Sequence, residues 1–373
     1  MQSTEILVIG AGIAGASAAA ELAANAEVVM LEMESQPGYH ASGRSAAYFA
    51  TSYGSRTVRE ITACCETFLR DPPDGFSDVP LLVPRDNIWF AREDQQESLE
   101  AMSAENPQLV RVSAEQIRKR VPVFRHGYLL GGLWDRRGGD IDVDALLQGY
   151  LRQFKQRGGK LFNNHEVSRV DRIGERWVVT AGGQQYSAEV VVNAAGGWAE
   201  EMGALAGLEP LGVKPFRRTA LTVEPPAGVD ISAWPEMVDI DEEFYFKPDA
   251  GLILISPADE TPTRAVDAQP EDFDVAMGVH RFEQATGLDI RQVRASWAGL
   301  RTFAPDRLFV AGFDPRAEGF FWLAGQGGFG VQSAPAMAKL ARYLVNGISP
   351  QGDFSKVLEY VEEVSPERLL SEE

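Results

Sequence analysis

A glycine-rich motif between two short apolar runs is the feature that most constrains the fold of this chain. Residues 10–15 read Gly-Ala-Gly-Ile-Ala-Gly and directly follow the apolar run 6–9. A stretch of small residues then runs to about residue 24, and a second apolar run, 28–31, ends on Glu32. A strand, a glycine-rich turn, a helix and a second strand that ends on an acidic residue form the βαβ dinucleotide-binding fingerprint. The sequence therefore predicts a Rossmann-like α/β domain.

Each position of the motif has a physical role in holding a dinucleotide. Gly10 permits the tight turn, Gly12 lets the backbone approach a pyrophosphate, and Gly15 lets the helix pack close to the strand. The free N–H groups and the positive dipole end of the helix N-terminus favour phosphate. The carboxylate of Glu32 can accept hydrogen bonds from a ribose diol. The motif alone does not identify which dinucleotide binds.

Composition excludes several classes of partner and site. The formal net charge of −19 over 373 residues argues against nucleic acid or an anionic membrane surface as a partner. The two cysteines, Cys64 and Cys65, are adjacent in a predicted helix and cannot form a disulfide with each other without distortion, which indicates a reducing, cytoplasmic compartment. The four scattered histidines give no metal-ligand spacing, so we expect no metal site. We also expect no signal peptide and no integral membrane segment.

Small-residue strand ends recur far along the chain. One lies at residues 188–198 and another at 307–345, whereas 219–223 and 243–247 alternate with period two, as half-buried antiparallel strands do. The sequence therefore predicts a discontinuous dinucleotide-binding domain, residues 1–80, 140–210 and 301–373. Residues 81–139 and 211–300 are predicted to form an inserted antiparallel-sheet (α+β) domain that binds the substrate.

The glycine-rich segment from Gly325 to Gly330 favours a flavin over a nicotinamide cofactor. It lies between the apolar run 320–324 and a predicted helix that continues through Leu340. A helix N-terminus at this point could place N–H groups near a flavin pyrimidine ring, and its dipole would stabilise a reduced, anionic flavin.

Several further motifs extend over nearly the whole length: residues 36–40 (Gln-Pro-Gly-Tyr-His), 43–47 (Gly-Arg-Ser-Ala-Ala), 193–196 (Asn-Ala-Ala-Gly), 244–251 (Phe-Tyr-Phe-Lys-Pro-Asp-Ala-Gly), 297–301 (Trp-Ala-Gly-Leu-Arg) and 326–330 (Gln-Gly-Gly-Phe-Gly). With these motifs the chain resembles the D-amino-acid-oxidase-like superfamily of FAD proteins and, within it, is most similar to the D-arginine dehydrogenases. The resemblance implies a FAD-dependent oxidoreductase.

The resemblance also implies a set of cofactor contacts. FAD is expected to bind without a covalent bond, although His40 lies in a loop where a histidine attaches FAD covalently in related dehydrogenases of N-methylated glycines. The predicted FAD-binding residues are Gly10, Gly12, Ile13, Ala14, Gly15, Glu32, Gly43, Arg44, Ser45, Ala46, Val167, Ala195, Gly196, Trp198, Gly325, Gly327, Gly328, Gly330, Val331 and Gln332.

For the substrate, the resemblance places two arginines at the family's carboxylate-binding positions. Arg218 and Arg301 fall there, and a guanidinium binds a carboxylate through two parallel hydrogen bonds. Tyr245 is expected to add a hydrogen bond to the carboxylate, Tyr53 lies in a segment that matches a mobile active-site loop, and the carbonyl of Gly328 is expected to receive the substrate amine. Arg217, next to Arg218 on a predicted strand, would point the other way.

Two positions depart from the D-arginine dehydrogenases. Tyr48 replaces a histidine that helps to hold the substrate, which would alter the polarity beside the flavin. Asn87 replaces a glutamate that pairs with the guanidinium, and an amide supplies no counter-charge, so we expect D-arginine to be a poor substrate. Glu236 lies in a segment that lines the side-chain pocket in the family. It could supply a relocated charge, but the sequence favours a solvated carboxylate at a strand edge.

The resemblance thus implies oxidative deamination of a D-amino acid, with transfer of hydride from Cα to flavin N5 and hydrolysis of the imino acid to a 2-oxo acid and ammonia. One alternative is oxidation of a secondary amine such as sarcosine, and another is a flavoprotein without turnover. The small-molecule amino acid or amine is the expected partner. The electron acceptor stays open between a quinone, an electron-transfer protein and O₂.

Overall fold

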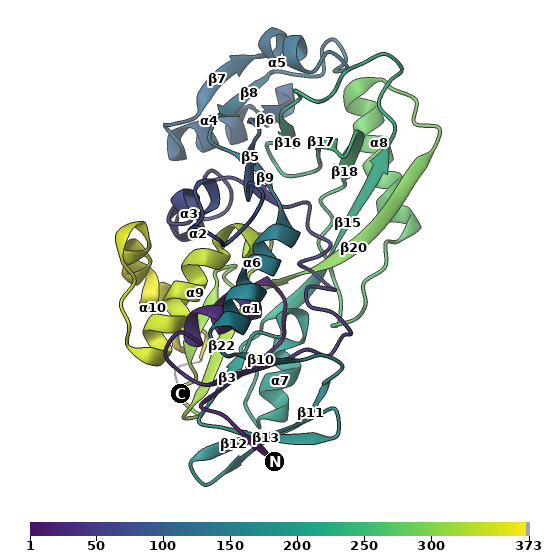
Figure 1. Ribbon diagram of the computed structural model, residues 1–373. Coiled ribbons are helices and arrows are strands. Elements are labelled where there is room, and N and C mark those ends of the chain that lie inside the picture. Colours follow the sequence, from purple (N-terminus) through teal and green to yellow (C-terminus); the bar gives the residue numbers. More distant parts are fainter. Residues whose placement is uncertain (371–373) are drawn as a thin grey trace.

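The predicted dinucleotide fingerprint lies in a six-stranded sheet of the computed structural model, which describes residues 1–370. The strand order is β10-β3-β2-β14-β22-β21, and all neighbouring pairs are parallel except β21 with β22. The three separate small-residue segments of the sequence therefore meet in one sheet, as predicted (Figure 1). These strands are β2 (Ile6–Ile9), β3 (Val28–Leu31), β10 (Lys160–Phe162), β14 (Val190–Asn193), β21 (Val310–Phe313) and β22 (Phe320–Ala324).

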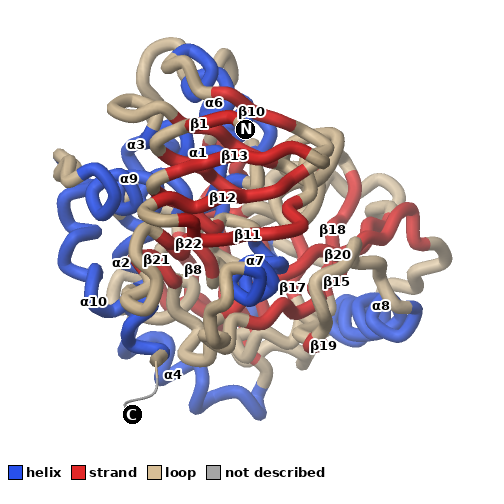
Figure 2. Tube along the Cα trace, turned by 90° about the horizontal axis from the view of Figure 1, so that it is seen from below, coloured by secondary structure: helices blue, strands red, loops and turns tan. Residues whose placement is uncertain are grey.

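Both faces of this sheet are covered, which explains why β2 is apolar at every position. Ile6 and Val8 pack in a core with the helices α1, α6 and α9, whereas Leu7 and Ile9 pack on the opposite side. There a second sheet, in the order β1-β13-β12-β11, and the helix α7 close the layer (Figure 2). Alternate strand residues point to opposite faces, so a strand buried on both faces reads as a continuous apolar run. The strands of the second sheet are β1 (Gln2–Ser3), β11 (Val167–Ile173), β12 (Arg176–Ala181) and β13 (Gln184–Ala188).

The small residues of α1 allow this helix to lie deep in the domain, packed between α6 and α9. Alanines on several sides of α1, including Ala16 and Ala19, are fully buried. A helix that is apolar all round is typical of a buried position. The helices are α1 (Ile13–Leu22), α2 (Arg56–Ala63), α3 (Glu66–Arg70), α4 (Gln96–Glu105), α5 (Ala114–Arg120), α6 (Val143–Gln156), α7 (Ala199–Leu205), α8 (Asp272–Thr286), α9 (Gly330–Asn346) and α10 (Val361–Val364).

A nine-stranded sheet forms the other lobe, at the top of Figure 1. Its order is β19-β15-β18-β17-β16-β6-β8-β7, and β20 pairs with β15 on the side of that path. The strands are β6 (Asn87–Ala91), β7 (Val110–Ser113), β8 (Gly131–Asp135), β15 (Lys214–Val223), β16 (Glu236–Asp239), β17 (Tyr245–Asp249), β18 (Leu252–Ser256), β19 (Thr261–Pro262) and β20 (Val293–Phe303). A Rossmann-like domain with an added sheet domain is confirmed.

The pairs of this sheet are antiparallel, as predicted, except that β16 and β6 are parallel. These strands come from the two separate insertions, 81–139 and 211–300, so no hairpin constrains their direction. The domain limits drawn from the sequence stay a proposal.

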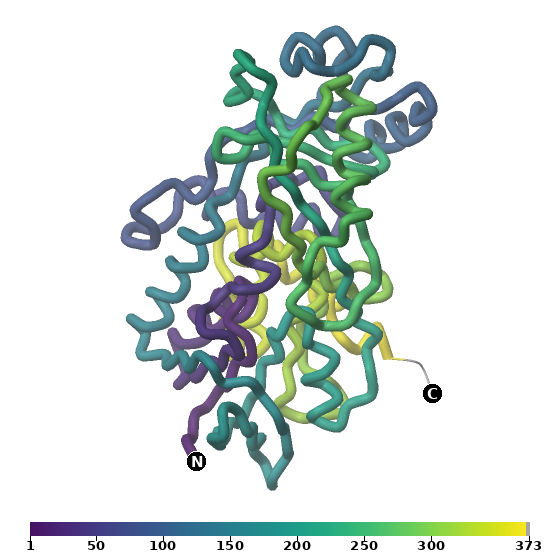
Figure 3. Tube along the Cα trace, turned by 90° about the vertical axis from the view of Figure 1, so that its right-hand side faces the viewer, coloured from purple at the N-terminus to yellow at the C-terminus, as the bar shows by residue number. Residues whose placement is uncertain are grey.

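The long strands β15 and β20 run from the first lobe into the second (Figures 1 and 3). A separate three-stranded sheet has the order β4-β9-β5, with strands β4 (Tyr48–Phe49), β9 (Gly139–Ile141) and β5 (Leu82–Pro84).

The cysteine pair does not lie within one continuous helix, contrary to the prediction. Helix α2 ends at Ala63 and α3 begins at Glu66, so Cys64 and Cys65 form the junction between them. Both thiols are free and buried, and burial raises the pKa of Cys64 to about 11. Protonated thiols of this kind are unreactive packing groups. None of the helices within residues 1–370 combines the length and the apolar character that a bilayer span requires.

Candidate active site

A cavity of about 570 Å³, called the larger cavity below, lies at the carboxyl ends of the parallel strands and extends toward the nine-stranded sheet. Ligands of open α/β sheets bind at this edge. Most of the predicted cofactor contacts line it. They are Gly10, Gly12, Ile13, Ala14, Glu32, Arg44, Ser45, Ala46, Val167, Ala195, Gly196, Trp198, Gly327, Gly328, Gly330 and Val331.

The glycines of the motif divide into two kinds. A Cβ atom on Gly15 would lie 1.9 Å from the carbonyl oxygen of Gly10, so Gly15 is required for packing of the helix on the turn. A Cβ on Gly12 would approach only the hydroxyl of Ser42, at 3.3 Å, so the absence of a side chain at Gly12 keeps this part of the larger cavity open. Gly10 itself has φ +99°, which favours glycine.

Three predicted cofactor contacts, Gly15, Gly43 and Gly325, do not line the larger cavity. A Cβ on Gly43 would lie 2.6 Å from the carbonyl oxygen of Gly38, and Gly325 has φ +70° beside the backbone of Leu308. These glycines allow two backbone segments to approach each other. Gln332 lies in the wall of a neighbouring cavity, where its amide bonds to Ala50 and Thr62.

The acidic end of the fingerprint is fixed by the backbone. Glu32 Oε2 accepts the N–H of Ala11 at 2.8 Å, and Oε1 accepts the N–H of Glu34 at 2.9 Å. A carboxylate oxygen can accept a second hydrogen bond, so Glu32 keeps acceptor capacity toward the cavity. The N–H of Ile13, at the start of α1, donates to the hydroxyl of Ser42 at 2.9 Å. Ser42 is not predictable from the sequence, because no local pattern links it to Ile13, 29 residues away.

Three side chains in the wall of the larger cavity carry a buried polar atom that finds no hydrogen-bond partner within residues 1–370. They are His40 at Nδ1, His165 at Nε2 and Gln326 at Nε2. Buried polar atoms are almost always paired in folded proteins, and exceptions indicate a ligand or solvent. Together with the glycine cradle and Glu32, these atoms fit a long cofactor with polar groups along its length, as FAD is.

A smaller cavity of about 80 Å³ adjoins the larger one. The two share seven wall residues: Ser45, Ala46, Arg218, Tyr245, Arg301, Gly328 and Val331. The other predicted catalytic residues, Tyr48, Tyr53 and Asn87, line the smaller cavity. The structure thus brings all the predicted catalytic residues into the wall of the smaller cavity, although they come from segments far apart in the sequence.

The two arginines lie on adjacent antiparallel strands. Arg301 of β20 is opposite Phe216 of β15, and Arg218 of β15 is opposite Gly299 of β20, so both side chains are on one face. Arg217 points away, as predicted, and pairs with Glu271 and with Asp274, the latter at 2.8 Å.

Arg301 is held in a close contact with Tyr53 and Gly328. Its Nη1 donates to the hydroxyl of Tyr53 at 3.1 Å. A Cβ on Gly328 would lie 2.9 Å from this nitrogen and 3.1 Å from the tyrosine hydroxyl. Gly328 therefore makes room for both groups. Burial raises the pKa of Tyr53, while the charge of Arg301 opposes that shift.

Arg218 is partly committed to protein partners. Its Nε donates to the carbonyl oxygen of Asp259 at 2.7 Å, and its Nη2 donates to Glu260 at 3.0 Å. Burial, followed by the nearby charge of Arg301, lowers the pKa of Arg218. Glu260, which is not among the predicted residues, partly neutralises this arginine.

Tyr48, which is predicted to alter the polarity beside the flavin, lines the smaller cavity. Its hydroxyl donates to the carbonyl oxygen of Arg85 and packs over Gly138, where a Cβ would lie 2.0 Å from it. Burial, followed by the charges of Glu236 and Asp135, holds the pKa of Tyr48 well above its usual value. With its hydroxyl occupied, Tyr48 contributes mainly the aromatic ring to the wall.

Glu236 is the clearest correction of a sequence prediction. It is not solvated: it is 7 % exposed and lines the smaller cavity. Its Oε2 accepts a hydrogen bond from Asn87 Nδ2 at 2.9 Å. Burial raises the pKa of Glu236 to about 7, against the opposing effects of Lys247 and of this hydrogen bond. Asn87 and Glu236 are partners in the parallel pair β6/β16, a relation that no local pattern reveals.

A second carboxylate in this wall, Glu242, comes from the tight loop between β16 and β17. It has φ +56°, an uncommon conformation for a side chain of this size. Burial raises the pKa of Glu242, and the charges of Arg301 and Arg218 oppose this. Glu242 is not among the residues predicted from the sequence.

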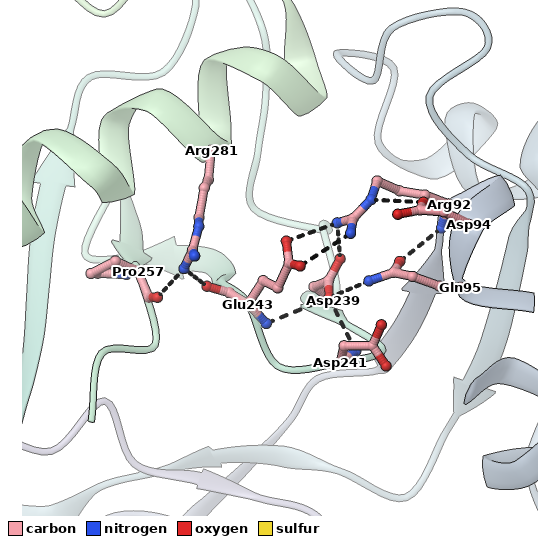
Figure 4. A network of polar contacts seen from close by, with 8 residues as sticks. All are labelled: Arg92, Asp94, Gln95, Asp239, Asp241, Glu243, Pro257 and Arg281. Carbon is pink, nitrogen blue, oxygen red and sulfur yellow. Dashed lines mark hydrogen bonds and ion pairs between the residues drawn. The ribbon is translucent and has the colours of Figure 1, made fainter. Parts of the chain in front are cut away.

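A polar network holds the loop of Glu242 in place (Figure 4). Asp239 accepts hydrogen bonds from Arg92 and Gln95, both at 2.8 Å, and Arg92 also binds both carboxylate oxygens of Glu243. Arg281 reaches the same loop from α8 and donates to the carbonyl oxygen of Glu243.

Comparison with known proteins identifies the family of this chain. The DAO family pattern, described as FAD dependent oxidoreductase, matches residues 5–344. A glycine oxidase of Pseudomonas aeruginosa is 26 % identical over 93 % of this chain and 96 % of its own.

Two solved structures share the fold. The glycine oxidase of Geobacillus kaustophilus superimposes with a TM-score of 0.83, at 22 % identity over 96 % of this chain and 98 % of its own. The iminodiacetate oxidase of Chelativorans sp. BNC1 superimposes with a TM-score of 0.80, at 20 % identity over 97 % of this chain and 99 % of its own. Because the family pattern covers most of the sequence, this chain belongs to the DAO family of FAD-dependent oxidoreductases.

Proposed function

We propose that this protein oxidises the carbon–nitrogen bond of an amino acid, with a D-amino acid as the first candidate substrate. One observation carries the proposal: Arg218 and Arg301 lie on one face of adjacent strands and line the junction of the two cavities. Two guanidinium groups at one buried place are suited to a carboxylate, which they can bind through parallel, charge-assisted hydrogen bonds. The resemblance to D-arginine dehydrogenases supports the D configuration.

The residues around Arg301 would orient this carboxylate. Tyr53 holds one nitrogen of the guanidinium at 3.1 Å, and Tyr245 lines both cavities beside it. Since Arg218 already donates to Asp259 and Glu260, Arg301 would interact with the substrate carboxylate more strongly than Arg218 does. Glu242 contributes an opposing charge nearby, so the site is not uniformly positive.

The cofactor would occupy the larger cavity without a covalent bond. Gly10, Gly12 and the N-terminus of α1 would hold its pyrophosphate, and Glu32 would hold the ribose. His40 Nε2 lies 2.9 Å from Glu34 Oε1. Because a carboxylate accepts hydrogen bonds and does not donate them, Nε2 carries the proton of this hydrogen bond. When bound, FAD supplies at its N5 atom a two-electron acceptor for the hydrogen on the carbon next to nitrogen.

The substrate amine must lose its extra proton before oxidation. Burial disfavours the charged ammonium form and lowers its pKa, so no strong base is required. The carbonyl of Gly328 and the hydroxyls of Tyr53 and Tyr245, three residues that line the smaller cavity, would accept hydrogen bonds from the neutral amine. The oxidised product is an imino acid, which takes up water and gives a 2-oxo acid and ammonia.

A secondary amine is the second candidate substrate. The similarity to two glycine oxidases and to an iminodiacetate oxidase favours it, since the last of these is named for a substrate with nitrogen between two carboxymethyl groups. Both candidates need a carboxylate-binding site. A flavoprotein without turnover has no use for the buried pair Arg218 and Arg301, which argues against that alternative.

Anaerobic reduction of the bound flavin tests the proposal. The purified holoenzyme is mixed with each D- and L-amino acid and with N-methylglycine and iminodiacetate, and the flavin absorbance near 450 nm is followed. Bleaching by D-amino acids supports the first candidate, and bleaching by the secondary amines alone replaces it with the second. If no amino acid or amine bleaches the flavin, the proposed function is wrong. Acid precipitation tests the cofactor linkage, because a pellet that stays yellow indicates covalent FAD.

A further inference from the structure

A row of polar side chains crosses three adjacent strands at the smaller cavity. Asp135 of β8 is the register partner of Asn87 of β6, and Asn87 is the register partner of Glu236 of β16. Side chains of register partners lie on the same face of a sheet. The three are 3 %, 1 % and 7 % exposed, respectively. Such a row is unexpected beside apolar wall residues such as Trp89 and Val238.

The row is rich in hydrogen-bond acceptors that lack donors. Asn87 Nδ2 donates to Glu236 Oε2, and this is the hydrogen bond that the Glu236 carboxylate makes within the described chain. Asn87 Oδ1 and Asp135 Oδ2 are buried and have no donor among residues 1–370. A buried acceptor without a donor costs about 1–3 kcal/mol, and an ionised one costs more. Asn87 and Glu236 both line the cavity, so a bound molecule can supply the missing donors.

The cations near Glu236 are already paired with another group. Lys247 Nζ lies 2.6 Å from Asp140, and Arg85 Nε lies 2.5 Å from the other oxygen of the same carboxylate. Arg218 and Arg301 line the part of the smaller cavity that it shares with the larger one, whereas Asn87 and Glu236 line the smaller cavity alone. The smaller cavity therefore has cationic groups where it adjoins the larger cavity and unpaired acceptors, one of them a carboxylate, in the part of its wall that it does not share.

We propose that the substrate carries a second, positively charged nitrogen group at the end away from its carboxylate, and that Glu236 and Asn87 Oδ1 bind this group. The inference rests on the proposed function, since it needs the carboxylate to lie on the arginines. It makes Glu236 a specificity-determining residue. From the sequence, a cationic side chain of the substrate is expected to find no counter-charge here. The carboxylate of Glu236 supplies that charge, because it lies on the strand next to Asn87.

Two ligands of equal chain length test the proposal by binding. 5-Aminopentanoate carries a carboxylate and a distal ammonium, pentanoate carries the carboxylate alone, and neither has an α-amine to oxidise. Each is titrated into the holoenzyme at pH 8, with the Kd read from the change in flavin absorbance and checked by calorimetry. A charge-assisted hydrogen bond contributes about 1.5–3 kcal/mol, so 5-aminopentanoate should bind about tenfold to a hundredfold more tightly.

The variant Glu236→Gln should remove this preference and leave the Kd of pentanoate within about twofold of the parent, which also shows that the site is folded. Glu242→Gln is the matched control, because Glu242 lines the same cavity but lies near the arginines. It should retain the preference. If Glu242→Gln loses the preference and Glu236→Gln keeps it, the assignment to Glu236 is wrong.

The wild-type ratio decides the proposal even if a variant fails to fold. Equal or tighter binding of pentanoate overturns the inference, while bleaching of the flavin by neutral amino acids leaves the proposed function intact. If neither carboxylate binds and no amino acid bleaches the flavin, the proposed function itself is overturned, and the inference falls with it.

Discussion

Asn87 Nδ2 lies 2.9 Å from Glu236 Oε2 across the parallel strand pair β6/β16. This pair joins the two insertions that build the nine-stranded sheet. The hydrogen bond therefore forms only when segments 149 residues apart have folded together. It places an amide and a carboxylate in the wall of the smaller cavity, which Arg218 and Arg301 also line.

The buried carboxyl of Glu236 should make stability depend on pH. Its pKa is raised from 4.5 to about 7 by burial, so between these values the folded state holds a proton that the unfolded state has lost. Stability then falls as pH rises through this window. Glu236→Gln removes the ionisation and should raise the free energy of unfolding by about 2–3 kcal/mol at pH 8, with little change at pH 4.5.

Urea unfolding of the holoenzyme at the two pH values measures this difference, with flavin content matched between parent and variant. The control is Glu318→Gln, at a carboxylate whose side chain is 94 % exposed, and its effect should not vary with pH. An equal effect of Glu236→Gln at both pH values would show that the carboxyl titrates normally.

The sequence predicts the parts of the site that depend on local patterns. It does not predict the parts that depend on contacts between distant segments. The fingerprint strands are local patterns, apolar at every position because both faces are buried, and they were predicted correctly. The single acid of Pro-Glu-Met-Val gives no periodicity that assigns a face, so Glu236 could not be placed. Its surroundings depend on pairing with β6 and on charges of β9 and β17, which only the tertiary structure brings together.

The two kinds of glycine in the fingerprint should give different defects. In Gly15→Ala the new Cβ would lie 1.9 Å from a backbone oxygen, so the apoprotein should lose about 1–3 kcal/mol of its free energy of unfolding. In Gly12→Ala the Cβ approaches only a serine hydroxyl at 3.3 Å, but it enters the cavity. The apoprotein should keep its stability and bind FAD roughly tenfold more weakly or worse.

Denaturant unfolding of the apoproteins and fluorescence titration with FAD separate these outcomes. Equal losses of stability in both variants would contradict the assignment of Gly12 to the cavity and Gly15 to packing.

The network in Figure 4 predicts that the loop carrying Glu242 depends on Arg92. Arg92→Ala leaves the fully buried carboxylate of Asp239 without its cation and should destabilise the protein by about 3 kcal/mol. Because the loop lines the smaller cavity, KM should rise more than kcat falls. Asp94→Ala removes an exposed partner of the same arginine and should change neither the stability of the protein nor its KM and kcat. Thermal unfolding and steady-state kinetics with a substrate found by flavin bleaching check both variants.

The pair Arg301 and Arg217 offers the sharpest test of the carboxylate site, because the two side chains leave adjacent strands toward opposite faces. Arg301 contacts Tyr53 at the junction of the cavities, whereas Arg217 pairs with Glu271 and Asp274. Arg301→Ala removes a buried cation that would be hydrogen-bonded to the substrate, a change that costs about 2–5 kcal/mol. The value of kcat/KM should therefore fall on the order of 10²–10³-fold at unchanged flavin content. Arg217→Ala should lower the melting temperature but keep kcat/KM at the parental order of magnitude. An Arg301→Ala enzyme as active as the parent would refute the carboxylate site, and with it the proposed substrate class.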